Sequence, residues 1–168
     1  MADAAELAAL HGLCFPEGWN VPAFEGFLAD PGYSLWVLRR AEAESVAGFL
    51  IARTAADEAE IITLAVAEDL RRQGFGRALL GQAAADLGRG PTTRIFLEVG
   101  SGNLAARRLY AACGFRLVGN RAGYYRESGE DALVLELRLG VADRGPGRRS
   151  GAATAAFEYG NKTKNSLE

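Results

Sequence analysis

The strongest constraint on the fold is a glycine turn, RRQGFG at residues 71–76, that leads directly into a run rich in alanine and leucine. The run predicts a helix over residues 74–87 with one apolar face. The first amides of a helix have no intrahelical partners, and the helix dipole leaves partial positive charge beside them. Because Gly74 and Gly76 carry no β-carbon, a phosphate can approach these amides, although the same residues also suit an ordinary loop-to-helix junction.

Three phosphate-binding motifs compete for these glycines. A Walker A loop requires a lysine followed by serine or threonine, which this segment lacks. A dinucleotide fingerprint requires GxGxxG directly after a strand, with an acidic residue about 20 positions later. Glu98 lies near that position, but Leu79 replaces the third glycine and residues 67–73 separate the glycines from the strand. The pattern R/Q-x-x-G-x-G/A is matched at every defined position by residues 71–76.

The composition indicates one unexported domain. The chain has 168 residues, of which 49% are hydrophobic and 24% charged, enough for one packed core. It contains no apolar run of about 18 residues, and its start, MADAAELAAL, is unlike a secretory leader. Two cysteines, Cys14 and Cys113, and one histidine, His11, argue against a disulfide scaffold or a metal centre. The formal net charge of −2 gives no reason to expect direct nucleic-acid binding. We therefore expect a cytoplasmic protein without a membrane segment or a metal.

Hydrophobic periodicity predicts an ordered series of helices and strands. Two short helices come first, followed by a hairpin formed by YSLWVLRR and SVAGFLIART and by a third strand in AEIITLAV. After the helix at 74–87 we expect a strand at 93–99, a helix at 104–112 that ends at a left-handed Gly114, and strands at 115–118 and 132–139. This order predicts an α/β (mixed α+β) fold, with a central mixed, mostly antiparallel sheet and helices on both faces.

The character of the chain changes after Leu139. Residues 140–168 are dominated by glycine, alanine, asparagine and lysine, and we expect the sheet to be complete before them. The chain therefore divides into a domain at 1–139 and a mostly disordered or loosely docked tail at 140–168. We interpret the arginines of the tail as the charges of a solvated linker.

These motifs together resemble those of the Gcn5-related N-acetyltransferase (GNAT) family, over most of residues 7–139. Besides the glycine loop, the resemblance rests on CFPEGW, DEAEIITLAV, LEVGSGNLAARRLYAACGF and GYYRESGEDALVLEL. Within the family the chain is most similar to the bacterial RimI-type group, which acetylates the N-terminal alanine of ribosomal protein S18. Gly100 and Gly102 depart from that group, which usually has arginine and serine there, and the departure bears on affinity or peptide preference.

The resemblance implies acetyl-CoA as the donor. Backbone amides of the glycine loop would hold its pyrophosphate. The strand before the loop would pair with the pantetheine arm, and the amide near Val66 would polarise the thioester carbonyl. Asn103 would reach the cofactor through its side chain, a role that is compatible with capping the next helix. The implied cofactor-binding residues are Leu64, Ala65, Val66, Arg71, Arg72, Gln73, Gly74, Phe75, Gly76, Arg77 and Asn103.

The implied acceptor is a protein N-terminal α-amine, which attacks only when neutral. Such an amine has a pKa of about 8, so a base is useful at pH 7. Glu98, at the end of the apolar strand RIFLEV, is the candidate base, with a surface carboxylate as the alternative. Tyr110 is the candidate acid for the departing thiolate, with a core tyrosine as the alternative.

The peptide groove would be lined by Trp19, Tyr124 and Tyr125, each of which would equally suit packing with a wet polar tip. His11 is expected to be an ordinary helix residue, because nothing near it in the sequence orients its ring. Two other functions stay open. The same fold would serve to acetylate a small metabolite or a protein lysine, or the chain would be a non-enzymatic acyl-CoA-binding module. The presence of both Glu98 and Tyr110 favours an enzyme.

Overall fold

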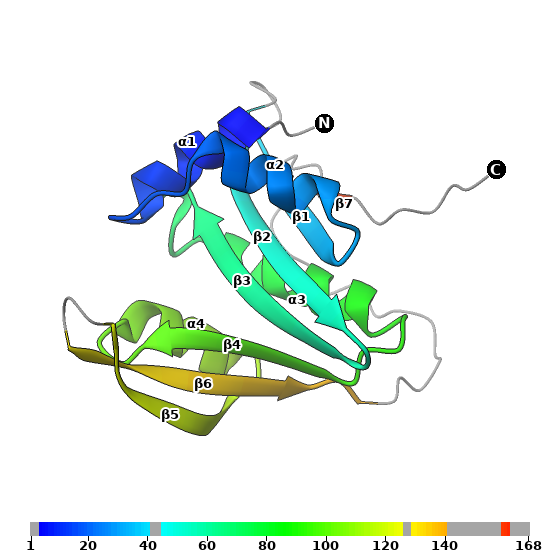
Figure 1. Ribbon diagram of the computed structural model, residues 1–168, viewed down its shortest axis with the longest axis vertical. Helices are drawn as coiled ribbons and strands as arrows, with labels where there is room; N and C mark the ends of the chain where they lie inside the picture. Colours follow the sequence, from blue (N-terminus) through cyan, green and yellow to red (C-terminus); the bar gives the residue numbers. More distant parts are fainter. Residues whose placement is uncertain (1–3, 41–44, 126–128, 141–158, 162–168) are drawn as a thin grey trace.

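The computed structural model describes residues 4–40, 45–125, 129–140 and 159–161, which form a seven-stranded sheet flanked by four helices (Figure 1). The helices are α1 (Ala4–Cys14), α2 (Val21–Ala29), α3 (Phe75–Leu87) and α4 (Leu104–Ala112), and a short 3₁₀ turn, η1 (Glu68–Leu70), precedes α3. The strands are β1 (Tyr33–Arg39), β2 (Val46–Ala55), β3 (Glu58–Val66), β4 (Arg94–Gly100), β5 (Arg116–Tyr125), β6 (Glu130–Arg138) and β7 (Tyr159–Asn161). Within these ranges, no helix has the length and apolar character needed to cross a membrane.

The strand order is β5-β6-β4-β3-β2-β1-β7, and β3 and β4 form the one parallel pair among the described strands. The two strands pair over residues 58–61 and 94–97, and beyond these positions they separate (Figure 1). The separation begins at a β-bulge, because Ile51 of β2 pairs with Thr63 while its neighbour pairs with Ile61, which leaves Ile62 as the extra residue. A bulge bends its strand and increases the local twist, so it directs the end of β3 away from β4.

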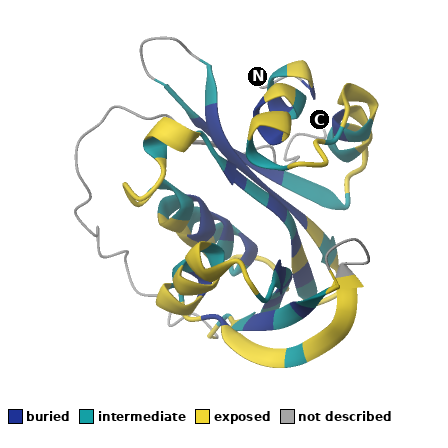
Figure 2. Ribbon diagram, turned by 90° about the vertical axis from the view of Figure 1, so that its left-hand side faces the viewer, coloured by how far each residue is buried: buried dark blue, intermediate teal, exposed yellow. Residues whose placement is uncertain are grey.

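The helices cover the two faces of the sheet unequally. On one face α1 and α2 pack over β1, β2 and β3, around the fully buried Phe24 and Phe49. On the other face α3 and α4 pack against the alternating buried residues of β4, which include Ile95 and Leu97. The residues of β4 between them point to the opposite face. Most residues of β5, the long curved strand at the bottom of Figure 2, are exposed.

The predicted fold class and the two-faced helix arrangement are confirmed, as are the helix at 104–112 and the left-handed Gly114, which has a φ of 90°. The strand expected at 115–118 is longer, because β5 is an edge strand whose exposed residues need no hydrophobic alternation. The expectation that the sheet is complete before residue 140 is wrong, since β7 pairs with Trp36–Leu38 of β1. The rest of the predicted tail lies outside the described residues.

Candidate active site

The glycine loop turns through two left-handed residues before α3 begins. Arg72 has a φ of 60° and Gly74 a φ of 90°. Gly74 is the N-cap of α3 and provides no side-chain hydrogen bond to the first turn. The helix therefore starts without the capping oxygen that Ser, Asp or Asn would supply, which leaves its N-terminal end suited to an external anion.

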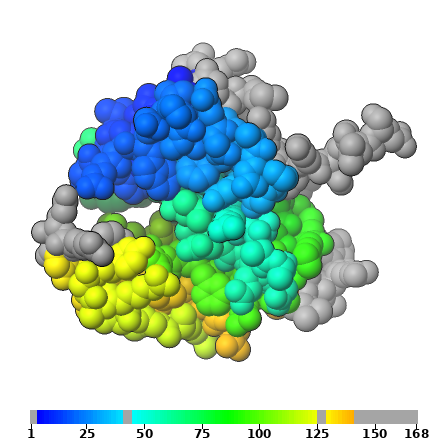
Figure 3. Space-filling model, viewed as in Figure 1, coloured from blue at the N-terminus to red at the C-terminus, as the bar shows by residue number. Residues whose placement is uncertain are grey.

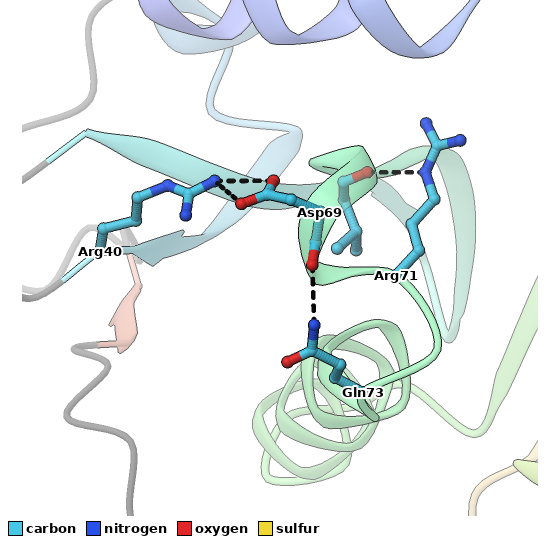
Figure 4. Close-up of polar contacts among 5 residues, drawn as sticks. Arg40, Asp69, Arg71 and Gln73 are labelled. Carbon is cyan, nitrogen blue, oxygen red and sulfur yellow. Dashed lines mark hydrogen bonds and ion pairs between the residues drawn. The ribbon is translucent and has the colours of Figure 1, made fainter.

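Two side chains of the loop motif brace the loop itself (Figure 4). Arg71 donates from Nε to the carbonyl oxygen of Val66 at 3.1 Å, and Gln73 donates from Nε2 to the carbonyl oxygen of Asp69 at 2.7 Å. The Asp69 carboxylate accepts two hydrogen bonds from Arg40, at 2.7 and 2.8 Å. The positions of Arg71 and Gln73 in the motif therefore have a local reason, because these contacts tie the loop to the end of β3 and to the 3₁₀ turn, which Arg40 holds from the end of β1.

The end of β3 presents backbone groups toward the separation from β4. The N–H of Ala67 donates to the carbonyl oxygen of Ala47 at 2.8 Å, which turns that residue toward β2. Because successive residues of a strand direct their backbone groups to opposite edges, Val66 and Leu64 face the side from which β4 has departed. The Val66 carbonyl oxygen on this side also accepts a contact from the Cys14 thiol at 3.6 Å.

A cavity of about 490 Å³ lies where β3, the glycine loop and α4 meet. Figure 3 shows the surface hollowed between the N-terminal helices, in blue, and β5, in yellow. The residues that line the cavity are Cys14, Phe15, Leu64, Ala65, Val66, Leu70, Arg71, Arg72, Gly74, Gly76, Asn103, Ala105, Ala106, Leu109 and Tyr110. The fold thus brings together eight of the eleven residues expected to bind the cofactor, with the candidate acid Tyr110 beside them.

Three expected cofactor residues are absent from this lining. Gln73 turns to Asp69, Phe75 packs against the core, and Arg77 lies close enough to Cys113 to act on its thiol electrostatically. Sequence patterns did not assign Cys14, Phe15 or the apolar residues of α4 (Ala105, Ala106 and Leu109) to the site. The helical spacing of these α4 residues could have indicated a shared face, whereas the end of α1 reaches the cavity only through tertiary packing.

Both ends of α4 are held firmly. At its start, Oδ1 of Asn103 accepts the N–H of Ala106 at 3.1 Å, so the residue is the expected N-cap while its amide nitrogen keeps two donors. At its end, the Phe115 N–H donates to the Tyr110 carbonyl and the Gly114 N–H to the Ala111 carbonyl, both at 3.0 Å, which is a Schellman motif. The Tyr110 and Phe115 rings meet edge to face at 5.7 Å. Tyr110 is therefore a fixed, buried wall of the cavity.

Glu98 lies on the other face of β4, where the side chains of β5 reach it. Nε of Arg121 lies 3.1 Å from Oε1 of Glu98 in an ion pair, and the Arg121 guanidinium also lies 5.7 Å from the centre of the Tyr124 ring. The negative charge of Glu98, and then its hydrogen bond with the phenol, raise the pKa of Tyr124, while Arg121 acts in the opposite direction. Tyr125 ends β5, but its side chain lies outside the described part of the structure.

The two candidate catalytic residues are therefore separated by the sheet. Tyr110 packs against the face of β4 that α3 and α4 cover. Glu98 and its partners lie on the opposite face, in the part of the sheet that α1 and α2 do not reach. The separation of β3 from β4 joins the two faces. An arrangement of this kind suits a reaction in which two substrates approach from opposite sides of the sheet.

The expectation that nothing orients His11 is wrong. Its Nδ1 accepts the backbone N–H of Trp19 at 3.1 Å, and its ring stacks on Phe15 and Trp19 with centroids 4.3 and 4.5 Å apart. The ring is 3% exposed, and this burial lowers the pKa of His11. Trp19 also contacts Phe27, with ring centroids 5.3 Å apart, so its described contacts are those of a packed side chain.

Comparison with known proteins agrees with this geometry. Residues 4–115 match the model of the family described as acetyltransferase (GNAT) family. The chain is 37% identical over 139 residues to the N-alpha-acetyltransferase RimI of Mycobacterium tuberculosis, which covers 80% of this chain and 85% of that protein. It is 36% identical over 98 residues to the ribosomal protein bS18-alanine N-acetyltransferase of Escherichia coli K12, covering 57% of this chain and 66% of that enzyme. The crystal structure of the ribosomal-protein-S18-alanine N-acetyltransferase from Escherichia coli superimposes with a TM-score of 0.75 at 27% identity, over 86% of this chain and 93% of the other.

Proposed function

We propose, from the premise that this chain belongs to the acetyltransferase (GNAT) family, that it moves an acetyl group from acetyl-CoA to a protein N-terminal α-amine. The N-terminal alanine of ribosomal protein S18 is the proposed acceptor, because relatives in two bacterial groups carry N-terminal acetyltransferase names. The observation that supports the proposal best is the cavity in which the glycine loop, the open edge of β3 and Tyr110 meet.

The residues of the cavity fit acetyl-CoA. At one end, Arg72 and the uncapped start of α3 offer positive charge and amides to a pyrophosphate. The space above the loop depends on Gly76, since a β-carbon there would lie 3.2 Å from Cδ2 of Leu109 on the facing helix. Apolar walls and the backbone edge at Leu64 and Val66 suit the slim pantetheine arm. The bound molecule would supply the activated thioester.

The acceptor amine would approach from the opposite face, at Glu98. Its role is to accept the proton that the α-ammonium must lose, since about pH 8 is needed for half of such amines to be neutral. Arg121 holds one oxygen of the carboxylate and Tyr124 also contacts the group, so both orient it. Trp19, Tyr124 and Tyr125 remain proposed walls of the peptide groove.

Tyr110 is the proposed acid on the donor side. Its hydroxyl belongs to a ring that the Schellman motif and Phe115 hold against the cavity, so the proton would be delivered from a fixed position to the departing thiolate. Asn103 would orient the donor through its amide nitrogen while its oxygen continues to cap α4. We place the reaction in the cytoplasm, with no metal and no direct contact with nucleic acid or membrane.

The test is mass spectrometry of short peptides incubated with acetyl-CoA. A peptide with the N-terminal sequence of S18 and a free alanine should gain one acetyl group on its α-amine. A matched peptide with a blocked N-terminus and a free lysine should not. Modification of the lysine alone would favour the alternative of another amine. Binding of acetyl-CoA without any transfer to peptides or metabolites would favour a non-enzymatic acyl-CoA-binding module.

A further inference from the structure

Gly100 and Gly102 lie where β4 leads into α4, and their backbone conformation does not explain why both are glycines. Neither Gly100 nor Gly102 has a φ in the left-handed region, so residues with side chains fit both backbone positions. A β-carbon at Gly100 would lie 2.7 Å from Oε1 of Glu130, and one at Gly102 would lie 3.1 Å from the same oxygen. The space that side chains at these positions would fill is occupied by the Glu130 carboxylate.

Glu130 is bonded to the loop that it overlies. It is the first residue of β6, and its Oε1 accepts the backbone N–H of Gly102. The neighbouring Asp131 carbonyl accepts the N–H of Ser101 at 2.9 Å, so the start of β6 holds two consecutive amides of the loop. From the other side, Nη1 of Arg107 donates to the Ser101 carbonyl oxygen at 2.6 Å. The loop is thus clamped between β6 and α4.

This clamp sets the position of one wall of the cavity. Gly102 accepts the N–H of Leu104 at 2.7 Å, so the residue held by Glu130 is also part of the turn that starts α4. The next residue, Asn103, caps the helix and lines the cavity, and further along α4 Leu109 and Tyr110 line it too. A shift of the loop would be transmitted to the helix start and to the side chain expected to contact the donor.

We propose that Glu130 is a positioning residue for acetyl-CoA binding. Positions 100 and 102 carry glycine because any larger residue there would displace the Glu130 carboxylate. A hydrogen bond from an amide to a carboxylate is stronger than one between neutral groups, so Glu130 holds the loop more firmly than a neutral acceptor would. The proposal rests on the proposed function, since it takes the cavity to hold acetyl-CoA.

The first experiment is calorimetric titration of the full chain with acetyl-CoA. Glu130→Ala should weaken binding by roughly three- to tenfold, the range expected for one hydrogen bond. Glu130→Gln should retain most of the affinity, because its amide oxygen still accepts from Gly102. Gly100→Ala should weaken binding as Glu130→Ala does, and the double variant should be no weaker than Glu130→Ala alone. Turnover at saturating acetyl-CoA should change little, so that the effect lies in KM.

Matched controls are Glu25→Ala, an exposed carboxylate of α2, and Gly81→Ala, where an added β-carbon meets nothing within 4 Å. Both should bind acetyl-CoA as the wild type does. Additive losses in the double variant, or a Glu130→Gln variant as weak as Glu130→Ala, would overturn the proposal.

Hydrogen exchange at the Gly102 amide separates this inference from the proposed function. Exchange should be slowest in the wild type, somewhat faster in Glu130→Gln and fastest in Glu130→Ala, whether or not the protein has transferase activity. Equal exchange in all three would show that Glu130 does not hold the loop. A wild type with the expected exchange pattern that fails to bind acetyl-CoA would instead refute the proposed function, and with it the role in binding.

Discussion

Arg121 forms an ion pair with Glu98, with Nε and Oε1 3.1 Å apart, although β6 lies between the strands that carry the two residues. The contact passes over β6 because both side chains project from the same face of the sheet, in the part that α1 and α2 leave uncovered. Glu98 is therefore held in place by its neighbours on β5 before any acceptor arrives. A base with a fixed position needs little reorganisation when the amine approaches.

The Glu98→Gln variant should lose turnover while keeping its affinity for acetyl-CoA, because the residue lies on the face opposite the donor cavity. Bases of this kind contribute about 10²- to 10⁴-fold. The loss should be smallest at high pH, where the amine is already neutral. Steady-state kinetics from pH ~6 to ~9, with calorimetry for acetyl-CoA, measure both quantities. Full activity with an unchanged pH profile would exclude Glu98 as the base.

The titration of Tyr124 should report its contact with Glu98. The carboxylate raises the pKa of Tyr124, first through its charge and then through a hydrogen bond. Glu98→Gln removes that charge, so the pKa of Tyr124 should fall toward its ordinary value of 10.0. Arg121 lowers the same pKa, so Arg121→Gln should raise it further. The absorbance of tyrosinate against pH, with Tyr124→Phe subtracted, gives the three values, and shifts of the opposite signs would contradict the geometry.

A methyl group at Gly76 should weaken acetyl-CoA binding. Its β-carbon would meet Leu109 at 3.2 Å and Val66 at 3.9 Å, at the point where α3 faces α4 across the cavity. The matched control is Gly81→Ala in the same helix, where the added group meets nothing within 4 Å. Both changes improve helix propensity, by up to about 1 kcal/mol, so that gain is common to the two variants and does not explain a difference in binding. Calorimetry should show weaker binding in Gly76→Ala alone, and equal affinities would refute the placement of the donor.

The stability of the protein should depend on the protonation of His11. Burial lowers the pKa of His11 from its ordinary value of 6.5. The unfolded chain therefore binds the proton more readily, so the stabilisation is complete above the unfolded pKa and is lost as the pH falls toward the folded pKa. Between pH ~7 and ~5 the Tm of the wild type should fall more steeply than that of His11→Phe. His11→Phe should be less stable at pH ~8, because the N–H of Trp19 loses its acceptor. Parallel curves would show that His11 does not titrate in this way.

Local patterns along the chain were sufficient to predict most of the elements. The helix at 104–112, the glycine loop before α3 and the left-handed Gly114 were all predicted, since periodicity and turn chemistry act between residues close in sequence. The length of β5 was not, because an exposed edge strand carries no hydrophobic alternation. The pairing of β7 with β1 was missed for a similar reason, as three residues in a polar segment provide no periodic signal.

The candidate site divides in the same way. Residues that act through their backbone, such as Gly74 and Val66, belong to continuous motifs, and their place beside the cavity follows from the strand, loop and helix that contain them. The contacts of Glu98 with Arg121, of His11 with Trp19 and of Glu130 with Gly102 depend on strand register and on the packing of separate elements. A shift of one residue in register would turn Glu98 to the other face of the sheet, so no local pattern specifies its partners. Short-range chemistry therefore encodes the loop that would hold the donor, whereas the assembled sheet positions the groups that would meet the acceptor.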